Sequence, residues 1–220
     1  MPSPQSVLDA AFAGEFGELR GNIPRTFATA LTSMIRREKP TLCIEIGMAY
    51  GISTLAILEG LGENCRLISI DPFQNSDFAG FGLDLVARTD RAAQHELIEA
   101  PDYLALPRLL EQGLRPDFAY IDGMHTFDYV LLDGFYIDKL LPVGGVAAFN
   151  DCGFRSIHKY LRFFRRHRRY EELDAGLTPD YRGANPAITA FRTLQRRSSQ
   201  DRYFRKLSDF EPAHNFFKNF

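Results

Sequence analysis

The sequence predicts an α/β fold, in which a mostly parallel sheet carries helices on both faces. Short apolar runs recur along the chain and end in acidic or amide side chains, at residues 42–46, 66–71, 118–122 and 146–151. Between them lie longer segments whose apolar residues are spaced three and four apart, as in amphipathic helices. Buried strands that alternate with helices are typical of parallel sheets.

Length and composition indicate one domain. The chain has 220 residues, of which 45% are apolar and 25% charged, and its formal net charge is −2. This length allows a substantial core, and the weak net charge does not favour binding to nucleic acid or membranes. No linker rich in Gly, Ser or Pro divides the sequence. We therefore expect a single domain over 1–220, with an N-terminal arm at 1–22 and an aromatic-rich C-terminal tail at 196–220.

Targeting signals are not evident in the sequence. No uncharged stretch is long enough for a membrane span, and the first 19 residues lack the basic region of a signal peptide. The cysteines are Cys43, Cys65 and Cys152, an odd number that lie far apart in sequence. This pattern suggests free thiols in a reducing compartment. We expect a cytoplasmic protein without a membrane partner.

A strand, a glycine turn and a helix follow one another in residues 41–58. Gly47 and Gly51 come directly after the apolar strand, and Ser53 opens a helical pattern. Glycines let a ligand approach the backbone, and the N-terminus of the helix offers unpaired N–H groups. The G-x-x-x-G spacing differs from the dinucleotide motif G-x-G-x-x-G, and no lysine follows Gly51 as in a phosphate loop. The turn is thus a ligand site of another kind.

The next strand supports a nucleoside-containing ligand. It ends at Asp71, about 20 residues after the glycine turn, where a carboxylate can accept bonds from ribose hydroxyls. The string from Glu45 to Ser53 resembles the first motif of class I S-adenosylmethionine-dependent methyltransferases. The resemblance implies a Rossmann-like, mostly parallel seven-stranded sheet with an antiparallel last strand. It also implies S-adenosyl-L-methionine as cofactor, bound by Glu45, Gly47, Gly51, Ser53 and Asp71, with Ala100, Pro101 and Asp102 at the position of the adenine pocket.

Oxygen-bearing side chains follow two further strands. Asp122 ends the apolar run at 118–121, and Asn150 and Asp151 end the run at 146–149. The carboxyl ends of parallel strands lie at one edge of a sheet, so these side chains can converge. Such ligands suit a hard cation such as Mg²⁺. His125 lies in the turn after Asp122, and its intrinsic pKa of about 6.5 suits a proton acceptor.

These residues resemble the metal-dependent small-molecule O-methyltransferases, which include the catechol O-methyltransferase and macrocin-type groups. The resemblance rests on Ile121-Asp-Gly-Met-His125 and on Leu140-Leu-Pro-Val-Gly-Gly145 with Phe149-Asn-Asp151, and it covers about residues 25–195. It implies Mg²⁺ held by Asp122, Asn150 and Asp151, and catalytic roles for Asp122 and His125. The catechol enzymes have a lysine base at the His125 position and Asp-Asn in place of Asn150-Asp151. A cation here would lower the pKa of His125.

Other interpretations of the same residues stay open. Asp122 and Asp151 could instead cap the helices that follow them, and His125 could be an ordinary surface histidine. The basic helix expected at 156–168 could contact phosphates, which would suit a metal-independent methyltransferase of RNA or another phosphate-bearing partner. A solvated charged face is the alternative, so nucleic acid is an unlikely partner. A non-catalytic S-adenosylmethionine-binding protein is a third possibility.

The C-terminal part is expected to complete the sheet and to add aromatic surface. Residues 170–173 and 187–194 have the pattern of the last two strands. The aromatic tail should pack on the domain, line the pocket or form a homo-oligomer interface. Phe73, Phe78 and Phe81 follow Asp71, where they either cover a ligand or anchor their loop. The sequence as a whole predicts an S-adenosylmethionine-dependent O-methyltransferase that acts on a small-molecule hydroxyl and uses Mg²⁺.

Overall fold

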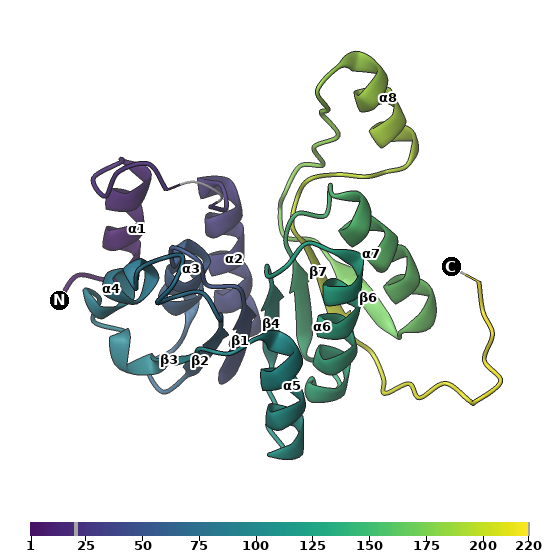
Figure 1. The fold of residues 1–220 in the computed structure, drawn as a ribbon, viewed down its shortest axis with the longest axis horizontal. Helices are drawn as coiled ribbons and strands as arrows, with labels where there is room; N and C mark the ends of the chain where they lie inside the picture. Colours follow the sequence, from purple (N-terminus) through teal and green to yellow (C-terminus); the bar gives the residue numbers. More distant parts are fainter. Residues whose placement is uncertain (20–21, 220) are drawn as a thin grey trace.

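The computed structural model describes residues 1–19 and 22–219, and seven strands in these ranges form one sheet (Figure 1). The strands are β1 Leu42–Ile46, β2 Arg66–Ile70, β3 His95–Ile98, β4 Phe118–Ile121, β5 Val146–Phe149, β6 Tyr170–Leu173 and β7 Arg202–Lys206. Their order across the sheet is β3-β2-β1-β4-β5-β7-β6. Strand β7 runs antiparallel to both of its neighbours, and the other pairings are parallel. The mostly parallel sheet with an antiparallel last strand is thus confirmed.

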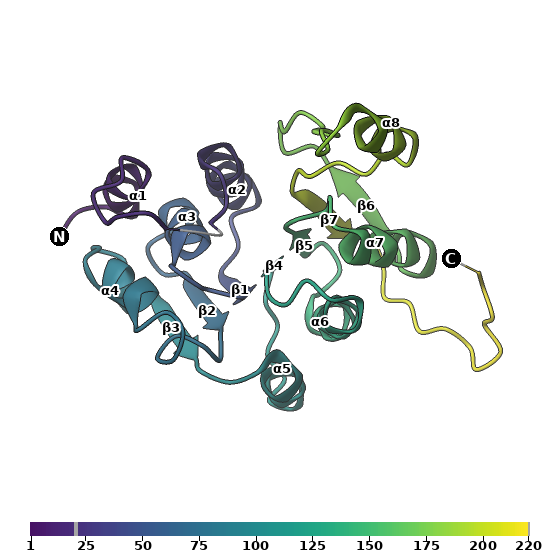
Figure 2. The same ribbon diagram turned by 45° about the horizontal axis from the view of Figure 1, so that its top comes forward.

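Helices cover both faces of this sheet (Figure 2). They are α1 Pro4–Phe12, α2 Arg25–Glu38, α3 Ile52–Gly60, α4 Phe81–Ala87, the short 3₁₀ helix η1 Ala92–Gln94, α5 Asp102–Glu111, α6 Phe127–Leu140, α7 Arg155–His167 and α8 Pro186–Leu194. The helices α1 to α4 enclose one core with the sheet, and α5 to α7 enclose the other. Alternate residues of β1 supply both cores, with Cys43 on the first face and Ile44 on the second, because side chains alternate along a strand.

The expected N-terminal arm is largely a helix that belongs to the domain. Ser3 caps α1 by accepting a hydrogen bond from the N–H of Ser6 at 3.3 Å, and Pro4 takes a first-turn position that needs no donor. Val7 and Leu8 are buried in the core that α3 shares. Residues 20 and 21 of the expected arm, and the last residue of the tail, lie outside the described residues.

The strand expected at 187–194 is wrong, because this segment forms helix α8. The side chain of Asn185 accepts a hydrogen bond from the N–H of Ile188 at 2.9 Å, and Pro186 is the first helical residue. The β-branched and aromatic residues of this segment favoured a strand. However, no residue of α8 is buried, so no sheet face selected these side chains. The capping pair Asn185-Pro186 was the more informative local signal.

The true last strand, β7, lies inside the segment expected to be a tail. Its Tyr203 and Phe204 are almost completely buried. The charged residues of this strand made it difficult to predict from the sequence. Two of them form ion pairs with residues that are distant in sequence. Arg202 pairs with Glu172 at 2.6 Å, and Arg205 pairs with Glu38 at 2.6 Å.

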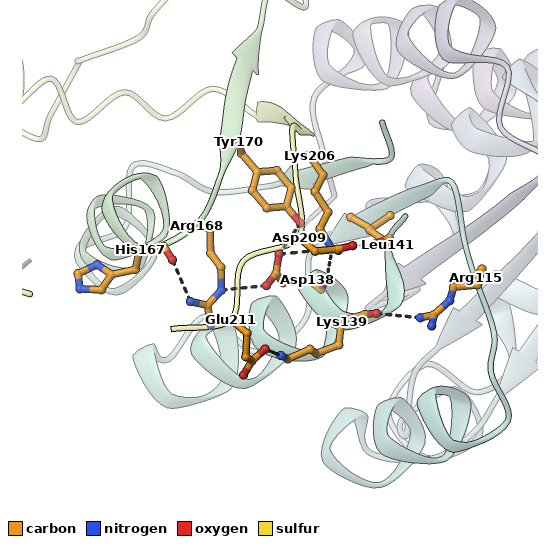
Figure 3. Close-up of polar contacts among 10 residues, drawn as sticks. All are labelled: Arg115, Asp138, Lys139, Leu141, His167, Arg168, Tyr170, Lys206, Asp209 and Glu211. Carbon is orange, nitrogen blue, oxygen red and sulfur yellow. Dashed lines mark hydrogen bonds and ion pairs between the residues drawn. The ribbon is translucent and has the colours of Figure 1, made fainter. Parts of the chain in front are cut away.

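Lys206 joins β7 to helix α6 through a buried polar network (Figure 3). Its Nζ donates to the carbonyl oxygen of Asp138 at 2.6 Å and lies 2.7 Å from Oδ1 of Asp209. The carboxylate of Asp138 accepts from Nε of Arg168 and from the hydroxyl of Tyr170, each at 2.9 Å. A buried ammonium group is tolerated only when such partners satisfy it. The network therefore fixes the C-terminal strand pair against α6.

The chain beyond β7 runs past the C-terminal end of α7 (Figure 1). The rings of Phe210 and Phe216 lie 5.4 Å apart, and Phe216 lies 5.8 Å from the ring of His167. Phe217 is 89% exposed. Among the described residues, no helix is both long enough and apolar enough to cross a bilayer.

Candidate active site

A cavity of about 460 Å³ lies at the carboxyl ends of the central strands β1, β2 and β4. Its walls come from the turn after β1, the loop after β2, the start of α5 and the turn after β4. The residues that line it include Gly47, Met48, Ala49, Ser53, Asp71, Phe73, Phe78, Pro101, Asp102, Tyr103, Asp122, Gly123, Met124, His125 and Tyr129. Asn22 and Ile23, which precede α2, also line it. In open α/β sheets this edge is where ligands bind.

Gly47 brings two strand ends together. Its φ is +87°, and a Cβ there would lie 2.3 Å from the carbonyl oxygen of Asp122. Only glycine allows the turn after β1 to lie this close to the turn after β4. Ala49, two residues later, also has a left-handed backbone with φ of +46°. Gly51 starts α3 but does not line the cavity, so its part is to shape the turn.

Asp71 holds the glycine turn in place. Its Oδ2 accepts from the backbone N–H of Met48 at 3.0 Å, from that of Ala49 at 2.8 Å and from Nε2 of Gln74 at 3.2 Å. Its Oδ1 accepts from the N–H of Phe73 at 2.8 Å. A carboxylate oxygen has two lone pairs, so Oδ1 can accept one more bond from a ligand in the cavity. Asp71 therefore orders the turn and also lines the cavity.

Glu45 does not reach the cavity. It is completely buried, and its Oε2 accepts from the hydroxyls of Thr54 at 2.7 Å and Ser69 at 2.6 Å. Burial raises the pKa of Glu45 to about 7. The structure thus places this residue beneath the turn, where it ties β1 to α3 and β2. The cofactor contact expected for it is not available in this geometry.

The segment after β3 brings one acidic side chain, Asp102, to the cavity wall. Pro101 and Asp102 line the cavity, whereas Ala100 does not. Asp102 lies next to Asp133 of α6, a completely buried residue whose carboxyl group interacts with that of Asp102. Burial, followed by the charge of Asp102, raises the pKa of Asp133 to about 9. The pair therefore holds a proton at neutral pH. Asp133 was not predicted, because it stands in the middle of a helical pattern.

Aromatic side chains form much of the remaining wall. Phe73 and Phe78 line the cavity, and the ring of Tyr50 lies 5.1 Å from Phe78 and 5.6 Å from Phe81. Both interpretations of this loop therefore apply, since Phe78 is anchored by Tyr50 and also faces the cavity. Tyr103 and Tyr129, whose rings lie 6.3 Å apart, complete the opposite side and were not predicted. Such rings offer surfaces on which a planar base can stack.

A cluster of three ionisable side chains lies at the end of the cavity near β4 and β5. Asp122, His125 and Asp151 each offer a ligand atom, and these atoms lie within 4.8 Å of one another. Nε2 of His125 is 2.9 Å from Oδ2 of Asp151 and 3.5 Å from Oδ1 of Asp122. Neither contact has the alignment of a hydrogen bond, although Nε2 is buried. Asp151 has a left-handed φ of +50°, a conformation that is common at functional sites.

The electrostatics of this cluster favour a positive charge between the carboxylates. Burial raises the pKa of Asp122 to about 6, which makes its ionised form costly without a cationic partner. The interactions of the imidazole with Asp122, and to a smaller extent with Asp151, raise the pKa of His125 to about 9. The protein groups thus shift this pKa in the direction opposite to the one expected for a metal-bound site. At neutral pH the imidazole alone supplies the positive charge.

Asn150 stands apart from this cluster. It is buried, and its Nδ2 donates to Oδ1 of Asp201 at 2.8 Å, while Oδ2 of Asp201 accepts from the hydroxyl of Tyr120 at 2.9 Å. Burial raises the pKa of Asp201 to about 8. Asp201 was not predicted, because it lies in the segment expected to be a tail. The structure therefore brings Asp151, rather than Asn150, to the acidic cluster.

Comparisons with known proteins agree with this geometry. Residues 44–152 match the family described as a methyltransferase domain. Solved structures with the same fold include an O-methyltransferase from Bacillus cereus in complex with SAH, at 13% identity and a TM-score of 0.69 over 93% of this chain and 90% of that one. Another is the O-methyltransferase TomG from Streptomyces achromogenes, involved in tomaymycin synthesis and solved with SAM, at 14% identity and a TM-score of 0.69 over 93% and 89%.

A methyltransferase from Geobacter sulfurreducens is also similar, at 13% identity and a TM-score of 0.63 over 93% of this chain and 88% of that one. The matched family spans β1 to the end of β5, which is the part that builds the glycine turn, Asp71 and the acidic cluster. The seven-stranded sheet with β7 inserted antiparallel between β5 and β6 extends this agreement to the whole fold. Residues 44–152 therefore form a methyltransferase domain, and the chain has the fold of the class I methyltransferases, which use S-adenosylmethionine as methyl donor.

Proposed function

We propose that this protein transfers the methyl group of S-adenosylmethionine to a hydroxyl group of a small molecule, with Mg²⁺ at the acidic cluster. The observation that carries the proposal is the continuity of one cavity. It extends from the glycine turn and Asp71 to Asp122 and His125, so a donor and an acceptor can lie side by side within it. Its volume of about 460 Å³ falls in the usual range for small-molecule sites. Two structurally similar proteins are O-methyltransferases by description, which supports the choice of oxygen as acceptor.

The cofactor is expected near the glycine turn. Backbone groups of Gly47 to Ala49 and the free acceptor site on Oδ1 of Asp71 would bind its ribose and amino-acid parts, and Tyr103 and Phe73 would contact the base. The sulfonium methyl group is already reactive. The work of the protein is thus to align donor and acceptor for in-line attack, and the aromatic walls exclude water from that position.

The cluster fits a divalent cation. Asp122 and Asp151 supply two carboxylates, and the buried Nε2 of His125 has no aligned hydrogen bond that a metal would have to replace. Asp122 and Asp151 would hold the cation, and Asn150, oriented by Asp201, lies behind them. When bound, Mg²⁺ would lower the pKa of an acceptor hydroxyl and fix its position. His125, in its neutral form, would accept the proton that this hydroxyl loses.

The high pKa of His125 favours one alternative, a metal-independent enzyme in which the imidazolium itself fills the place of the cation. The two mechanisms differ in their response to chelation. In the metal-dependent enzyme, EDTA abolishes methyl transfer and Mg²⁺ restores it, while calorimetry shows that S-adenosylmethionine still binds. Full activity after exhaustive chelation would select the metal-independent mechanism.

The acceptor class can be tested at the same time. Purified protein with labelled S-adenosylmethionine and Mg²⁺ would be offered catechols, hydroxylated sugars and short RNA. Methylation of a small hydroxyl compound supports the proposal. Methylation of RNA alone would replace it. Cofactor binding without turnover on any hydroxyl compound would point to a non-catalytic binding protein.

A further inference from the structure

A second cavity, of about 330 Å³, lies between α7 and α8, and its walls are strongly basic. Figures 1 and 2 both show α8 above α7, outside the layers of the sheet. The residues that line the cavity are Arg155, His158, Lys159, Arg162, Phe191, Gln195 and Arg197. No carboxylate is among them. The α7 residues recur at helical spacing, so they project from one face of that helix.

Arg197 is the buried centre of this cavity wall. The residue is only 6% exposed, and its Nε has no hydrogen-bond partner among the described residues. The neighbouring Arg192 differs, since it donates to the carbonyl oxygens of Arg182 and Arg197 and to the hydroxyl of Ser199. An arginine stays charged in proteins, and a buried charge without a partner is costly. An anion bound in the cavity would therefore stabilise the buried guanidinium group of Arg197.

The other cations of the cavity are also free of acidic partners. Within 1–19 and 22–219, none of Arg155, Lys159 and Arg162 forms an ion pair, and all three are exposed. Nearby Arg202 is already neutralised by Glu172. Burial and the surrounding arginines lower the pKa of His158, which agrees with a positive local field.

The basic cavity shares a loop with the acidic cluster. Arg155 follows Asp151 by four residues, so their Cα atoms lie within about 14 Å of each other. The ring of Phe154, at the start of α7, packs edge-on against His125 at 5.2 Å. Gly153 lies close to the segment after α8, because a Cβ there would be 3.0 Å from the Cα of Ser199. The loop therefore holds both sites at a fixed separation.

We propose that the basic cavity binds a phosphate or sulfate ester group carried by the methyl acceptor, while the hydroxyl of that acceptor reaches Asp122 and Asp151. This inference rests on the proposed function, because it names the class of substrate for the same site. Four cationic side chains supply more charge than one carboxylate would need, and Arg guanidinium groups suit tetrahedral oxyanions. A nucleic-acid backbone fits less well, because it would need cationic side chains along an extended path and the net charge of the chain is −2.

The first test uses inorganic phosphate and inorganic sulfate, titrated calorimetrically at constant ionic strength. Arg197→Gln and Arg162→Gln should each weaken binding at least tenfold. Arg165→Gln is the matched control, because Arg165 lies on the same helix, is exposed and does not line the cavity. Arg162 is exposed as well, so its variant should fold even if Arg197→Gln does not. Equal binding by all four proteins, or no binding by the wild type, would overturn the proposal.

The second test asks whether the site selects the acceptor. Hydroxylated sugars would be compared with their phosphate and sulfate esters as methyl acceptors, which separates the two ester sources. The esters should have a KM at least tenfold lower than the parent sugars. Arg162→Gln should raise the KM of the esters to that of the parent sugars, whereas Arg165→Gln should keep the preference. The proposal would be contradicted if neither ester were preferred to its parent sugar. It would also be contradicted if RNA inhibited the reaction more strongly than either ester. The phosphate titration needs neither cofactor nor turnover, so its failure is distinguishable from failure of the proposed function.

Discussion

The side-chain amide of Asn150 donates a hydrogen bond to Oδ1 of Asp201 at 2.8 Å, and this contact joins two positions 51 residues apart. It ties the end of β5, beside the candidate metal site, to the residue that precedes β7. Asp201 is 1% exposed and also accepts from the hydroxyl of Tyr120 on β4. The last strand of the sheet therefore helps to fix the edge on which the acidic cluster is built.

Removal of this contact should affect both stability and metal affinity. Asp201→Ala leaves the buried amide of Asn150 and the hydroxyl of Tyr120 without a partner, so we expect a loss of about 1–3 kcal/mol in the free energy of unfolding. Urea denaturation measures this loss. Affinity for Mg²⁺, measured by calorimetry, should fall as well. Tyr120→Phe is the control, because it keeps the bond from Asn150 and should leave metal affinity unchanged. Equal Mg²⁺ binding by Asp201→Ala and the wild type would show that this contact is purely structural.

Asp71 should couple cofactor binding to the order of the glycine turn. Asp71→Ala removes the acceptor for the N–H groups of Met48 and Ala49 and the free lone pair that faces the cavity. We expect affinity for S-adenosylmethionine to fall by about 1.5–3 kcal/mol, the usual contribution of charge-assisted hydrogen bonds. The melting temperature should fall too. Asp77→Ala, on the exposed part of the same loop, should change neither quantity. Unchanged cofactor affinity in a folded Asp71→Ala variant would remove Asp71 from the ribose site.

If His125 is the general base, the rate of methyl transfer should depend on both pH and the Mg²⁺ concentration. Only the neutral ring accepts a proton, so activity should rise with pH through the pKa of His125 and then level off. The two carboxylates raise this pKa to about 9, and a divalent cation opposes the protonated ring. The midpoint should therefore move to lower pH as the Mg²⁺ concentration increases. The rate must be measured across pH at several Mg²⁺ concentrations.

The His125→Ala variant completes this test. It should lose about 10²–10⁴ in kcat, the range for one general base, with little change in cofactor affinity. His214→Ala, in the exposed C-terminal tail, is the control. If His125→Ala keeps nearly normal turnover and the same pH profile, the ring takes no part in proton transfer.

The stability of the protein should decrease as the pH rises. Asp133 has a folded-state pKa of about 9, well above the unfolded value of about 3.9, so the folded protein holds a proton that the unfolded chain releases. Between these two values this group alone lowers the free energy of unfolding by about 1.4 kcal/mol per pH unit. The stability it provides is complete below the unfolded pKa and is lost as the pH approaches 9. Glu45 adds a smaller effect of the same sign up to its pKa of about 7.

Asp133→Asn isolates this contribution. The neutral amide cannot ionise, so the variant should be more stable than the wild type at pH 8 and lose this advantage near pH 4. Thermal unfolding of both proteins from pH 4 to pH 9 measures the difference. Asp128→Asn, at an exposed position of the same helix, should follow the wild type. Parallel curves for Asp133→Asn and the wild type would mean that Asp133 is not the group that retains the proton.

Several parts of the fold and site were determined by local sequence. The strand 42–46, the glycines after it and Asp71 form a contiguous unit, because a buried strand needs an apolar run and a tight turn needs glycine. The same holds for Asp122 and Asp151, which directly follow the apolar strands β4 and β5. Parallel pairing then places these strand ends at one edge. For such features the sequence alone was sufficient.

The remaining features depend on contacts between distant residues, which only the tertiary structure determines. The strand β7 can contain Arg202, Arg205 and Lys206 because other elements supply carboxylates and carbonyl oxygens that bind these side chains. No local pattern predicts such partners. Glu45 was expected at the cofactor, yet the direction of its side chain follows from strand alternation and from the hydroxyls that surround it. The burial of Arg197 likewise depends on the position of the segment after α8 beside residues of α7. The burial and the electrostatic environment of a residue depend on neighbours that are distant in sequence. The sequence alone therefore does not determine them.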